Sequence, residues 1–580
     1  MILNIFNRCK WGMGVAAAAL SLSLTSCSDF FNPETDDQIA DKDYISENTE
    51  MYTGFIGIIT KMQAVGDKEI LLTDTRAEML EPTTNAGTDL VNVYDYADNL
   101  KGNSYASPAA YYELINACND YLSKVSDYCK QPQVDDEVCQ NLISSTIRIK
   151  VWAYKTVGEI YGEAAWLDEP VGNVDKFLET ARQNVIPMNK IVDKCLDLLE
   201  NGYNGVAANR TVDWIAWLDP DNVTNIANSS YRKWNYIVPA YEGLYAELCL
   251  WKGAYIDSEQ GVGSAEAKVY YQNAADQLLT AINSYQNSSQ NSGNNPYWVP
   301  NAGTAGRYTS IWQQASKDPY APENVSVILY DYLNGQTNSL VKHFNTDAPA
   351  EYLLEPSEAG MDNFTNKEKN PGGSDGETRY KNLIGKTGTG YYIAKFRHNG
   401  GRSGVRASAN EDDIHIYIYR AMQYHLMLAE ALNQLNRFTA LGCILNTGMT
   451  NATVEEELVN GTNQDEWRGF TSNWTKNGEN GTIKYPPIGI RGAYSLSART
   501  IQDAKTSAAK RANDIQVLKE CELELSCEGK TYPWMNRVAV RYNDPSIIAD
   551  EVCPKYEASG KAATVRAKIM NGGNWVKYPL

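Results

Sequence analysis

The chain has 580 residues and carries 52 lysines and arginines against 71 aspartates and glutamates, a net charge of −19 at pH 7. This charge repels polyanions, which excludes nucleic acid and anionic membrane surfaces as partners. Beyond the first 26 residues the sequence contains no apolar run of 18 residues, so we expect no membrane-spanning helix in the body of the chain. The length is sufficient for a large buried core.

The N-terminus has the arrangement of a bacterial lipoprotein signal. Two basic residues lie within the first ten, an apolar stretch runs from Trp11 to Leu24, and the tetrapeptide LTSC ends at Cys27. This tetrapeptide resembles a lipobox, in which the cysteine thiol is acylated and becomes the mature N-terminus. An ordinary secretory signal or a buried cysteine is the alternative.

The lipobox also predicts how this end of the chain is divided. We expect a signal peptide over residues 1–26, an acylated Cys27, and a polar tether over residues 27–45. Stable anchoring needs two or more acyl chains, because each buried methylene contributes only about 0.8 kcal/mol. The body of the protein would then be attached to the membrane through its lipid anchor only.

The cysteines are a poor framework for disulfides. Of the eleven, nine remain once Cys9 leaves with the signal and Cys27 is acylated, and they are scattered. Cys118 and Cys129 would share a helix face but lie roughly 16 Å apart along it, which is too far to bond. We therefore predict that most of the cysteines are small buried hydrophobic residues.

Long amphipathic helices dominate the predicted structure. Apolar residues recur at helical spacing along 138–160, and a second helix opens with Pro239, which suits the first helical position. A turn at Gly261 and Gly263 leads from this helix to a partner, and two such helices bury their faces best as an antiparallel pair. A single domain is expected over 46–580, with a first helix at 46–64 and a helical scaffold at about 108–163, 187–201, 232–287, 415–445 and 513–528.

The strongest helical pattern covers residues 417–438, where a broad apolar face includes small alanines. Small residues, aromatics and paired helices resemble tetratricopeptide repeats, although no clean 34-residue period is present. A last helix is expected at 513–528, and the stretch 71–100 reads as loop with a short strand. The predicted fold class is mainly α, with tetratricopeptide-like helical hairpins, long ordered loops and minor short β-structure.

Four polar stretches rich in glycine and asparagine connect the helices, at 201–231, 286–324, 360–412 and 446–500. Loops this long are usually functional or disordered. Disordered chain is poor in aromatics, so the tryptophans in these stretches favour order. They are Trp214, Trp217, Trp298, Trp312, Trp467 and Trp474.

Catalytic and metal-binding motifs are missing from the sequence. LIGKTG lacks the earlier glycine of a phosphate loop, which is Tyr380 here, and there is no H-E-x-x-H, Gly-x-Ser-x-Gly or EF-hand loop. His425 falls on the apolar face of the 417–438 helix, so we expect a core histidine. A glycosidase needs two carboxylates at a set separation, and the sequence singles out no pair. We predict no catalytic residue, metal or cofactor.

Aromatic side chains with a polar tip are abundant: 38 Tyr and 13 Trp stand against 10 Phe. Such rings suit sites that are apolar on one side and wet on the other, where flat sugar faces can stack. Trp152, Trp234 and Trp251 lie in predicted helices and are expected to pack in the core. For the loop tryptophans, ligand binding and packing both stay open.

Several segments resemble the SusD/RagB family of cell-surface lipoproteins of Bacteroidetes. The helix YRAMQYHLMLAEALNQLNRF is similar to the family's R-Y-A-E-x-x-L-x-x-A-E-A helix, and VLKECELELSCEGKTYPWMNR to its E-R-x-x-E-L-x-F-E-G segment. Residues 110–122, 147–170 and 239–255 also match family helices. The family's Asn-x-x-Arg is Asn446-Thr447-Gly448 here, without the arginine, and its Arg-x-x-Asp-Leu is replaced by Thr531-Tyr532-Pro533-Trp534-Met535. The chain therefore resembles a divergent member, and the matched motifs carry no ligand-binding residues.

The resemblance implies a non-enzymatic binder on the extracellular face of the outer membrane. It would sit on a TonB-dependent, SusC-like transporter, capture oligosaccharides and pass them inward, whereas RagB-like members are associated with peptides. A peptide-capturing protein is the alternative, because an open groove with backbone-reading amides would suit a peptide. A surface glycosidase is the third hypothesis.

Two loops are the predicted ligand-binding regions. The loop at about 290–320 alternates aromatics with Asn, Gly and Arg, which suits a stacking platform, and the loop at about 73–100 offers polar side chains that could read hydroxyl groups. The candidates in the first loop are Tyr297, Trp298, Arg307, Tyr308 and Trp312. Those in the second are Asp74, Arg76, Asn85, Tyr94, Tyr96 and Asn99.

Overall fold

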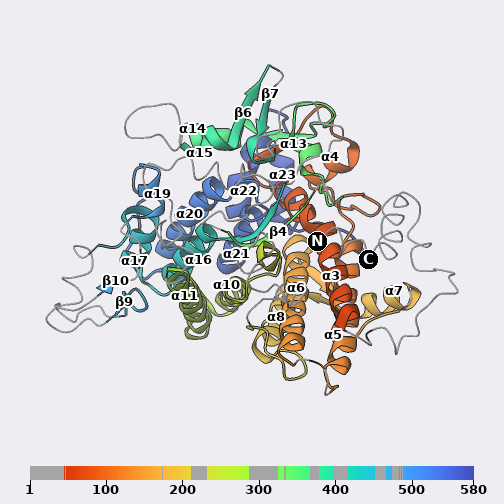
Figure 1. Ribbon diagram of the computed structural model, residues 1–580. Helices are drawn as coiled ribbons and strands as arrows, with labels where there is room; N and C mark the ends of the chain where they lie inside the picture. Colours follow the sequence, from red (N-terminus) through yellow and green to blue (C-terminus); the bar gives the residue numbers. More distant parts are fainter. Residues whose placement is uncertain are drawn as a thin grey trace.

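The computed structural model is built mainly from helices (Figure 1). It describes residues 45, 48–131, 134, 136–172, 174–210, 232–286, 324–331, 335–365, 378–388, 390–396, 414–450, 465–472, 482–483, 485 and 488–579. The predicted signal peptide, Cys27 and the candidates Tyr297, Trp298, Arg307, Tyr308 and Trp312 lie outside these residues, as do Trp214, Trp217 and Trp474.

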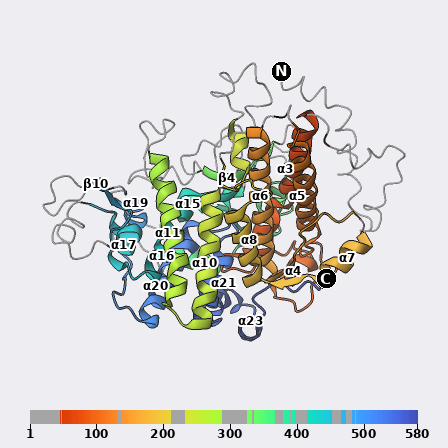
Figure 2. The same cartoon turned by 90° about the horizontal axis from the view of Figure 1, so that it is seen from below.

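The N-terminal half contains a row of long helices that lie side by side (Figure 2). Helix α5 packs on α6 and α3, and α6 packs on α8. These helices are α3 (Asn48–Thr73), α5 (Ala109–Tyr128), α6 (Asp136–Tyr161) and α8 (Met188–Asn201), with the shorter α4 (Thr88–Tyr94) and α7 (Val174–Gln183) beside them.

The row continues with an antiparallel pair, α10 (Tyr241–Gln260) and α11 (Ala265–Gln286). The predicted turn joins them: Gly261 and Gly263 have φ of 95° and 92°, which side chains disfavour. The Asp257 carboxylate accepts a hydrogen bond from the Gly263 amide at 3.0 Å and orients this turn. Helix α11 packs next on α16 (Ala421–Gln434), and α16 on α20 (Ser507–Glu524). The predicted mainly α, hairpin-based fold is confirmed.

Short elements surround the long helices. The short helices are η4 (Arg232–Ile237), α13 (Leu340–Phe344), α14 (Glu358–Thr365), α15 (Thr378–Leu383), η7 (Ala394–Phe396), α17 (Phe438–Gly442), η8 (Cys443–Thr447) and α19 (Ile490–Ala493). Among the described residues every sheet is two-stranded and antiparallel. The pairs are β1 (Leu80–Pro82) with β5 (Leu354–Pro356), β2 (Glu163–Ala165) with β3 (Val185–Pro187), β4 (Asn324–Ile328) with β8 (Ile416–Arg420), β6 (Ile384–Thr387) with β7 (Gly390–Ile393), and β9 (Thr471–Ser472) with β10 (Thr482–Ile483).

The prediction of one helix over 417–438 is wrong at its start. Residues Ile416–Arg420 form strand β8, and all five are buried. A fully buried strand shows no alternation of apolar and polar residues, so its pattern merges with that of the following helix. Helix α16 then begins at Ala421, and Asn436, with φ of 62°, lies between α16 and α17. Pro239 lies two residues before α10 rather than at its first position.

The C-terminal region contains more helices than predicted. Helix α20 begins at Ser507, because the Thr506 hydroxyl accepts a hydrogen bond from the Ala509 amide and caps it. After α20 come α21 (Thr531–Tyr542), α22 (Ser546–Val552), η9 (Cys553–Tyr556) and α23 (Ala562–Met570). The expected last helix at 513–528 is therefore not the last. The stretch 360–412, expected to be a loop, contains α15 and the β6–β7 hairpin.

The expectation for the cysteines is correct except for one pair. Cys129 at the end of α5 and Cys139 at the start of α6 form a disulfide, with Cα atoms 5.9 Å apart. The two helices are antiparallel, so residues ten apart in sequence meet across their turn, and distances along a single helix do not reveal the pair. Cys118, Cys195, Cys249, Cys443, Cys521, Cys527 and Cys553 are free and buried, as predicted.

Ion pairs inside the core join α20 to distant segments. Arg379 of α15 contacts Glu520 and Glu524, each at 2.8 Å, and Arg420 at the end of β8 contacts Glu524 at 2.8 Å and Glu528 at 2.8 Å. These side chains are almost fully buried. A buried charge that loses its partner is strongly destabilising, so these pairs fix the C-terminal region in one position.

Candidate functional site

The C-terminal segment and the end of α4 enclose two adjoining hollows. The larger has a volume of about 770 Å³ and the smaller about 360 Å³, both within the usual range of small-molecule sites. Asp98 and Lys577 line both hollows, so the two hollows are neighbours.

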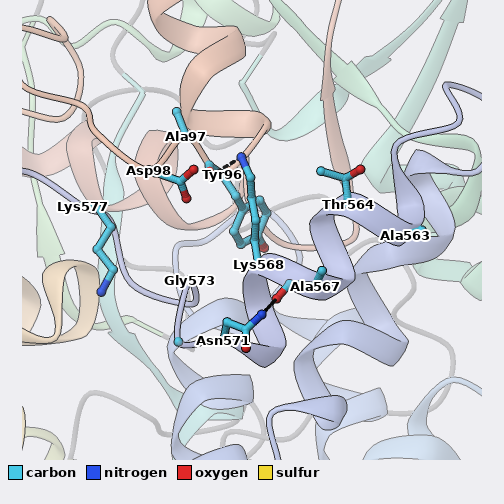
Figure 3. Close-up of a pocket in the computed structure, with 11 residues that line it drawn as sticks. Tyr96, Ala97, Asp98, Ala563, Thr564, Ala567, Lys568, Asn571, Gly573 and Lys577 are labelled. Carbon is cyan, nitrogen blue, oxygen red and sulfur yellow. Dashed lines mark hydrogen bonds between the residues drawn. The ribbon is translucent and has the colours of Figure 1, made fainter.

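Three segments form the larger hollow (Figure 3). Residues 96–98 follow α4, helix α23 provides one wall, and Gly572 and Gly573 lie at the end of that helix. The alanines of α23 leave the space open. The lining residues are Tyr96, Ala97, Asp98, Ala563, Thr564, Ala567, Lys568, Asn571, Gly572, Gly573 and Lys577.

Arg76 supports the larger hollow from behind. Its guanidinium lies 4.1 Å from the centre of the Tyr96 ring and donates hydrogen bonds to the Gly573 carbonyl at 2.6 Å and the Asn574 carbonyl at 3.3 Å. The Tyr96 hydroxyl donates to the Arg76 carbonyl at 2.7 Å, and burial raises the pKa of Tyr96 well above its usual value. Arg76 therefore connects the two sides of the hollow.

Lys568 fixes helix α23 against the end of α4. Its ammonium donates hydrogen bonds to the carbonyls of Asp95 at 3.2 Å and Tyr96 at 2.9 Å. Lys561, near the start of α23, pairs with the Asp95 carboxylate at 2.6 Å. These contacts hold Tyr96, with φ of 54°, in its left-handed backbone conformation.

The smaller hollow is lined by aromatic rings. Tyr112 and Tyr161 come from α5 and α6, and Trp575 and Tyr578 from the C-terminal segment. Both tyrosine hydroxyls are used by the protein: that of Tyr112 accepts from the Ala165 amide at 2.7 Å, and that of Tyr161 donates to the Ala106 carbonyl at 2.9 Å. Their rings therefore act as apolar walls.

Trp575 is held firmly at this hollow. Gly162, with φ of 76°, lets the indole approach so closely that a Cβ at this position would lie 2.7 Å from it. The next residue, Val576, donates its amide to the Ile160 carbonyl at 2.9 Å, and the Lys577 carbonyl accepts from the Leu100 amide at 2.9 Å. The C-terminal segment is thus a fixed wall of both hollows.

Four polar side chains of the hollows are available to a ligand. Asp98, Glu163, Thr564 and Lys577 make no side-chain hydrogen bond or ion pair with any other residue that the structure describes. The polar groups behind them are bonded within the protein, as for Arg76. This contrast is typical of a binding surface on a rigid support.

The structure places most residues predicted in the 73–100 loop away from solvent. Asp74 is buried and accepts a hydrogen bond from the Gly529 amide at 2.6 Å, and burial raises the pKa of its carboxyl. Arg76 and Tyr94 are also buried, and only Tyr96 lines a hollow. These side chains were expected to face a ligand, but they are buried and contact other parts of the protein. Their contact with a ligand stays a prediction.

The two predicted asparagines are exposed. The Asn85 side-chain amide donates to the Glu351 carbonyl at 3.0 Å, and the Asn99 side chain accepts from the Lys101 amide at 2.9 Å. Neither lines the hollows that the structure describes. The predicted set is therefore not brought together in one place.

Sequence reasoning missed the C-terminal contribution to the site. The final stretch NGGNWVKYPL combines glycine, asparagine and aromatics, the same criterion that selected residues 290–320. The predicted helices end at residue 528, whereas this stretch follows α23. Asp98 lies inside the predicted loop but was not selected.

The histidine and some of the tryptophans that were expected in the core are buried there. His425 is fully buried and its Nδ1 contacts the Tyr485 hydroxyl, so it is the predicted core histidine. Trp152, Trp251 and Trp467 are buried as well. Within the described ranges no cluster of His, Cys, Asp and Glu could hold a metal ion. None of the described helices has the length and hydropathy to cross a membrane.

The fold is similar to that of several solved structures, although the sequence alone finds no relative. No family model and no curated protein sequence matches the chain. A SusD superfamily protein from Bacteroides vulgatus ATCC 8482 superposes with a TM-score of 0.55 at 11% identity, covering 92% of this chain and 95% of that one. A laminarin-binding SusD-like protein gives 0.50 at 12% identity, with coverage of 92% and 96%.

A third similar structure is surface glycan-binding protein A from Bacteroides thetaiotaomicron, in complex with laminarihexaose. Its TM-score is 0.50 at 12% identity, covering 86% of this chain and 91% of that one. The chain therefore has the SusD-like fold. It is a divergent example, and the resemblance noted in its sequence is confirmed at the level of the fold.

Proposed function

We propose that this protein is a cell-surface glycan-binding lipoprotein that captures oligosaccharides and delivers them to a TonB-dependent outer-membrane transporter. The observation that carries the proposal is the pair of hollows, where aromatic rings lie beside polar side chains free of partners among the described residues. Sugar rings stack on aromatic faces and their hydroxyls need polar partners. Similar structures of a laminarin-binding protein and of a laminarihexaose complex support a glycan ligand.

A peptide is the alternative ligand, as in RagB-like proteins. A peptide requires groups that pair with its backbone, and Asn571 is the one side-chain amide that lines the described hollows. Binding of the purified protein to immobilised neutral and acidic oligosaccharides and to a peptide library tests both. We expect glycan binding; binding to peptides alone would reverse the assignment.

A surface glycosidase stays the third hypothesis, and Asp98 and Glu163 are two carboxylates that line the smaller hollow. We propose binding without catalysis. The measurement is the release of reducing ends from each oligosaccharide that binds. Release by the purified protein that disappears in Glu163→Gln would establish an enzyme.

The lipid anchor and the location are part of the proposal. The LTSC motif supports acylation at Cys27. The Cys129–Cys139 disulfide supports an exported protein, because disulfides persist in oxidising compartments. We expect wild-type cells to incorporate a palmitate analogue into the protein and Cys27→Ala cells not to. Protection from protease on intact cells would contradict exposure at the surface.

The transporter partnership follows from the proposed role. Affinity purification of the protein from detergent-solubilised outer membranes should recover a TonB-dependent transporter. Its gene is expected beside that of this protein, together with glycoside hydrolases. A neighbourhood of peptidases would favour the peptide alternative.

A further inference from the structure

We infer that one uncharged oligosaccharide lies across both hollows and that one of its sugar rings stacks on Trp575. This inference rests on the proposed function for the class of ligand. It goes further in assigning the site to the C-terminal segment and in excluding acidic glycans.

The two hollows lie next to each other. Asp98 and Lys577 line both, and each hollow alone has the volume of a small-molecule site, about 770 and 360 Å³. A ligand that uses both must be longer than a single ring. A chain of several sugar units meets this requirement, whereas a monosaccharide would occupy only one hollow.

The two ends of the site differ in chemistry. The smaller hollow contains Trp575, Tyr578 and two further tyrosine rings, while the larger contains Tyr96 as its one aromatic lining residue. Trp575 is half-buried, and its ring also lies near Trp251, with centroids 6.5 Å apart. A ring held this firmly loses little freedom when a ligand stacks on it. The ligand's most apolar face therefore belongs at this end.

The charges of the site balance. The carboxylates of Asp98 and Glu163 are matched by the ammonium groups of Lys577 and Lys568 across the two hollows. Lys568 already donates to two carbonyls. Around this balanced site the chain carries a net charge of −19, which repels anions. Hydroxyl groups can bond to both kinds of side chain, so an uncharged sugar chain fits better than uronic, sialic or sulfated sugars.

The test has two stages. The purified full chain is first applied to an array of neutral and acidic oligosaccharides of different lengths. We expect binding to neutral members, increasing with length beyond one sugar. Preferential binding to acidic members would overturn the inference and leave the proposed function intact. No glycan binding at all would contradict the proposed function itself.

The second stage locates the site by titration calorimetry with the best array ligand. We expect Trp575→Ala to weaken binding at least tenfold, and Asp98→Ala and Lys577→Ala to weaken it several-fold. The last two side chains have no protein partners among the described residues, so their loss should leave the fold intact. Asp503→Ala and Lys381→Ala, which alter exposed residues outside both hollows, are the matched controls. Wild-type affinity in all three site variants would place the ligand elsewhere and overturn the inference.

Discussion

Glu520 and Glu522 lie on one helix and are both buried, but their surroundings shift their pKa values in opposite directions. Burial disfavours the charged form of both, but Arg379, Arg499 and Arg491 lower the pKa of Glu520 below its usual value. At Glu522 burial dominates, and nearby Glu551 and Glu78 raise its pKa further. The Glu522 Oε1 atom has no hydrogen-bond partner among the described residues. The contributions of Glu520 and Glu522 to the free energy of unfolding should therefore change in opposite directions with pH.

Glu522→Gln should stabilise the protein at neutral pH. A carboxyl whose pKa is raised by folding costs stability once the pH exceeds its unfolded value, at about 1.4 kcal/mol per pKa unit. We expect a gain of at least about 1 kcal/mol at pH 8 that shrinks as the pH falls toward 4, measured by urea unfolding. A loss of stability at pH 8 would show that the carboxylate has a stabilising partner.

Glu520→Gln should be destabilising by about 3–5 kcal/mol at neutral pH, because buried arginines lose their partner. The pKa of Glu520 is lowered by folding, so its contribution is present above the unfolded pKa and is lost as the pH falls. The same unfolding measurements check this. Equal stability of the variant and the wild type at pH 7 would contradict the structural role of the ion pairs.

At the level of elements, the disulfide joins α5 and α6 across the turn of their hairpin. Replacing both Cys129 and Cys139 with serine should lower the free energy of unfolding by about 2–4 kcal/mol. Titration of the unreduced, denatured protein should find these two thiols blocked and that of Cys118 free. The Cys129→Ser, Cys139→Ser double variant is compared with Cys118→Ser, which removes no cross-link. Two extra reactive thiols in the wild type would contradict the pairing.

The contact between α6 and the C-terminal segment depends on Gly162. Alanine at this position would both strain the backbone, since φ is 76°, and clash with Trp575. We expect Gly162→Ala to cost about 1–2 kcal/mol of stability and to weaken glycan binding by moving the indole. Gly102→Ala is the matched control, because Gly102 has φ of 80° but open space around a Cβ. Unchanged ligand affinity in Gly162→Ala would show that the position of the Trp575 indole does not matter for binding.

Helical periodicity predicted the long elements well and the irregular ones poorly. The α10–α11 pair and α6 were predicted from one apolar stripe each, because their apolar residues recur at helical spacing. The structure buries more than that stripe, since every residue of α6 from Leu142 to Tyr161 is buried. Strand β8 could not be distinguished from the helix after it, since all its residues are buried. The disulfide and the hollows depend on contacts between segments distant in sequence, such as Gly162 with Trp575. No local pattern encodes such contacts.

At the scale of the whole molecule, the fold and the site have different origins. The helical scaffold repeats one arrangement, long helices packed against their neighbours, and the apolar pattern of the sequence reveals these helices. The site instead arises where the last residues of the chain return to α6 and to the end of α4. The loop at residues 290–320, whose composition predicts ligand binding, lies outside the described part of the chain. Their role stays a prediction.

The proposed binding site is tested most directly by a structure of the protein with a neutral oligosaccharide that binds to it. We predict a sugar ring parallel to the Trp575 indole and further units that pass Asp98 and Lys577 toward α23. A ligand bound elsewhere, for example on residues 290–320 with both hollows empty, would contradict the proposed site.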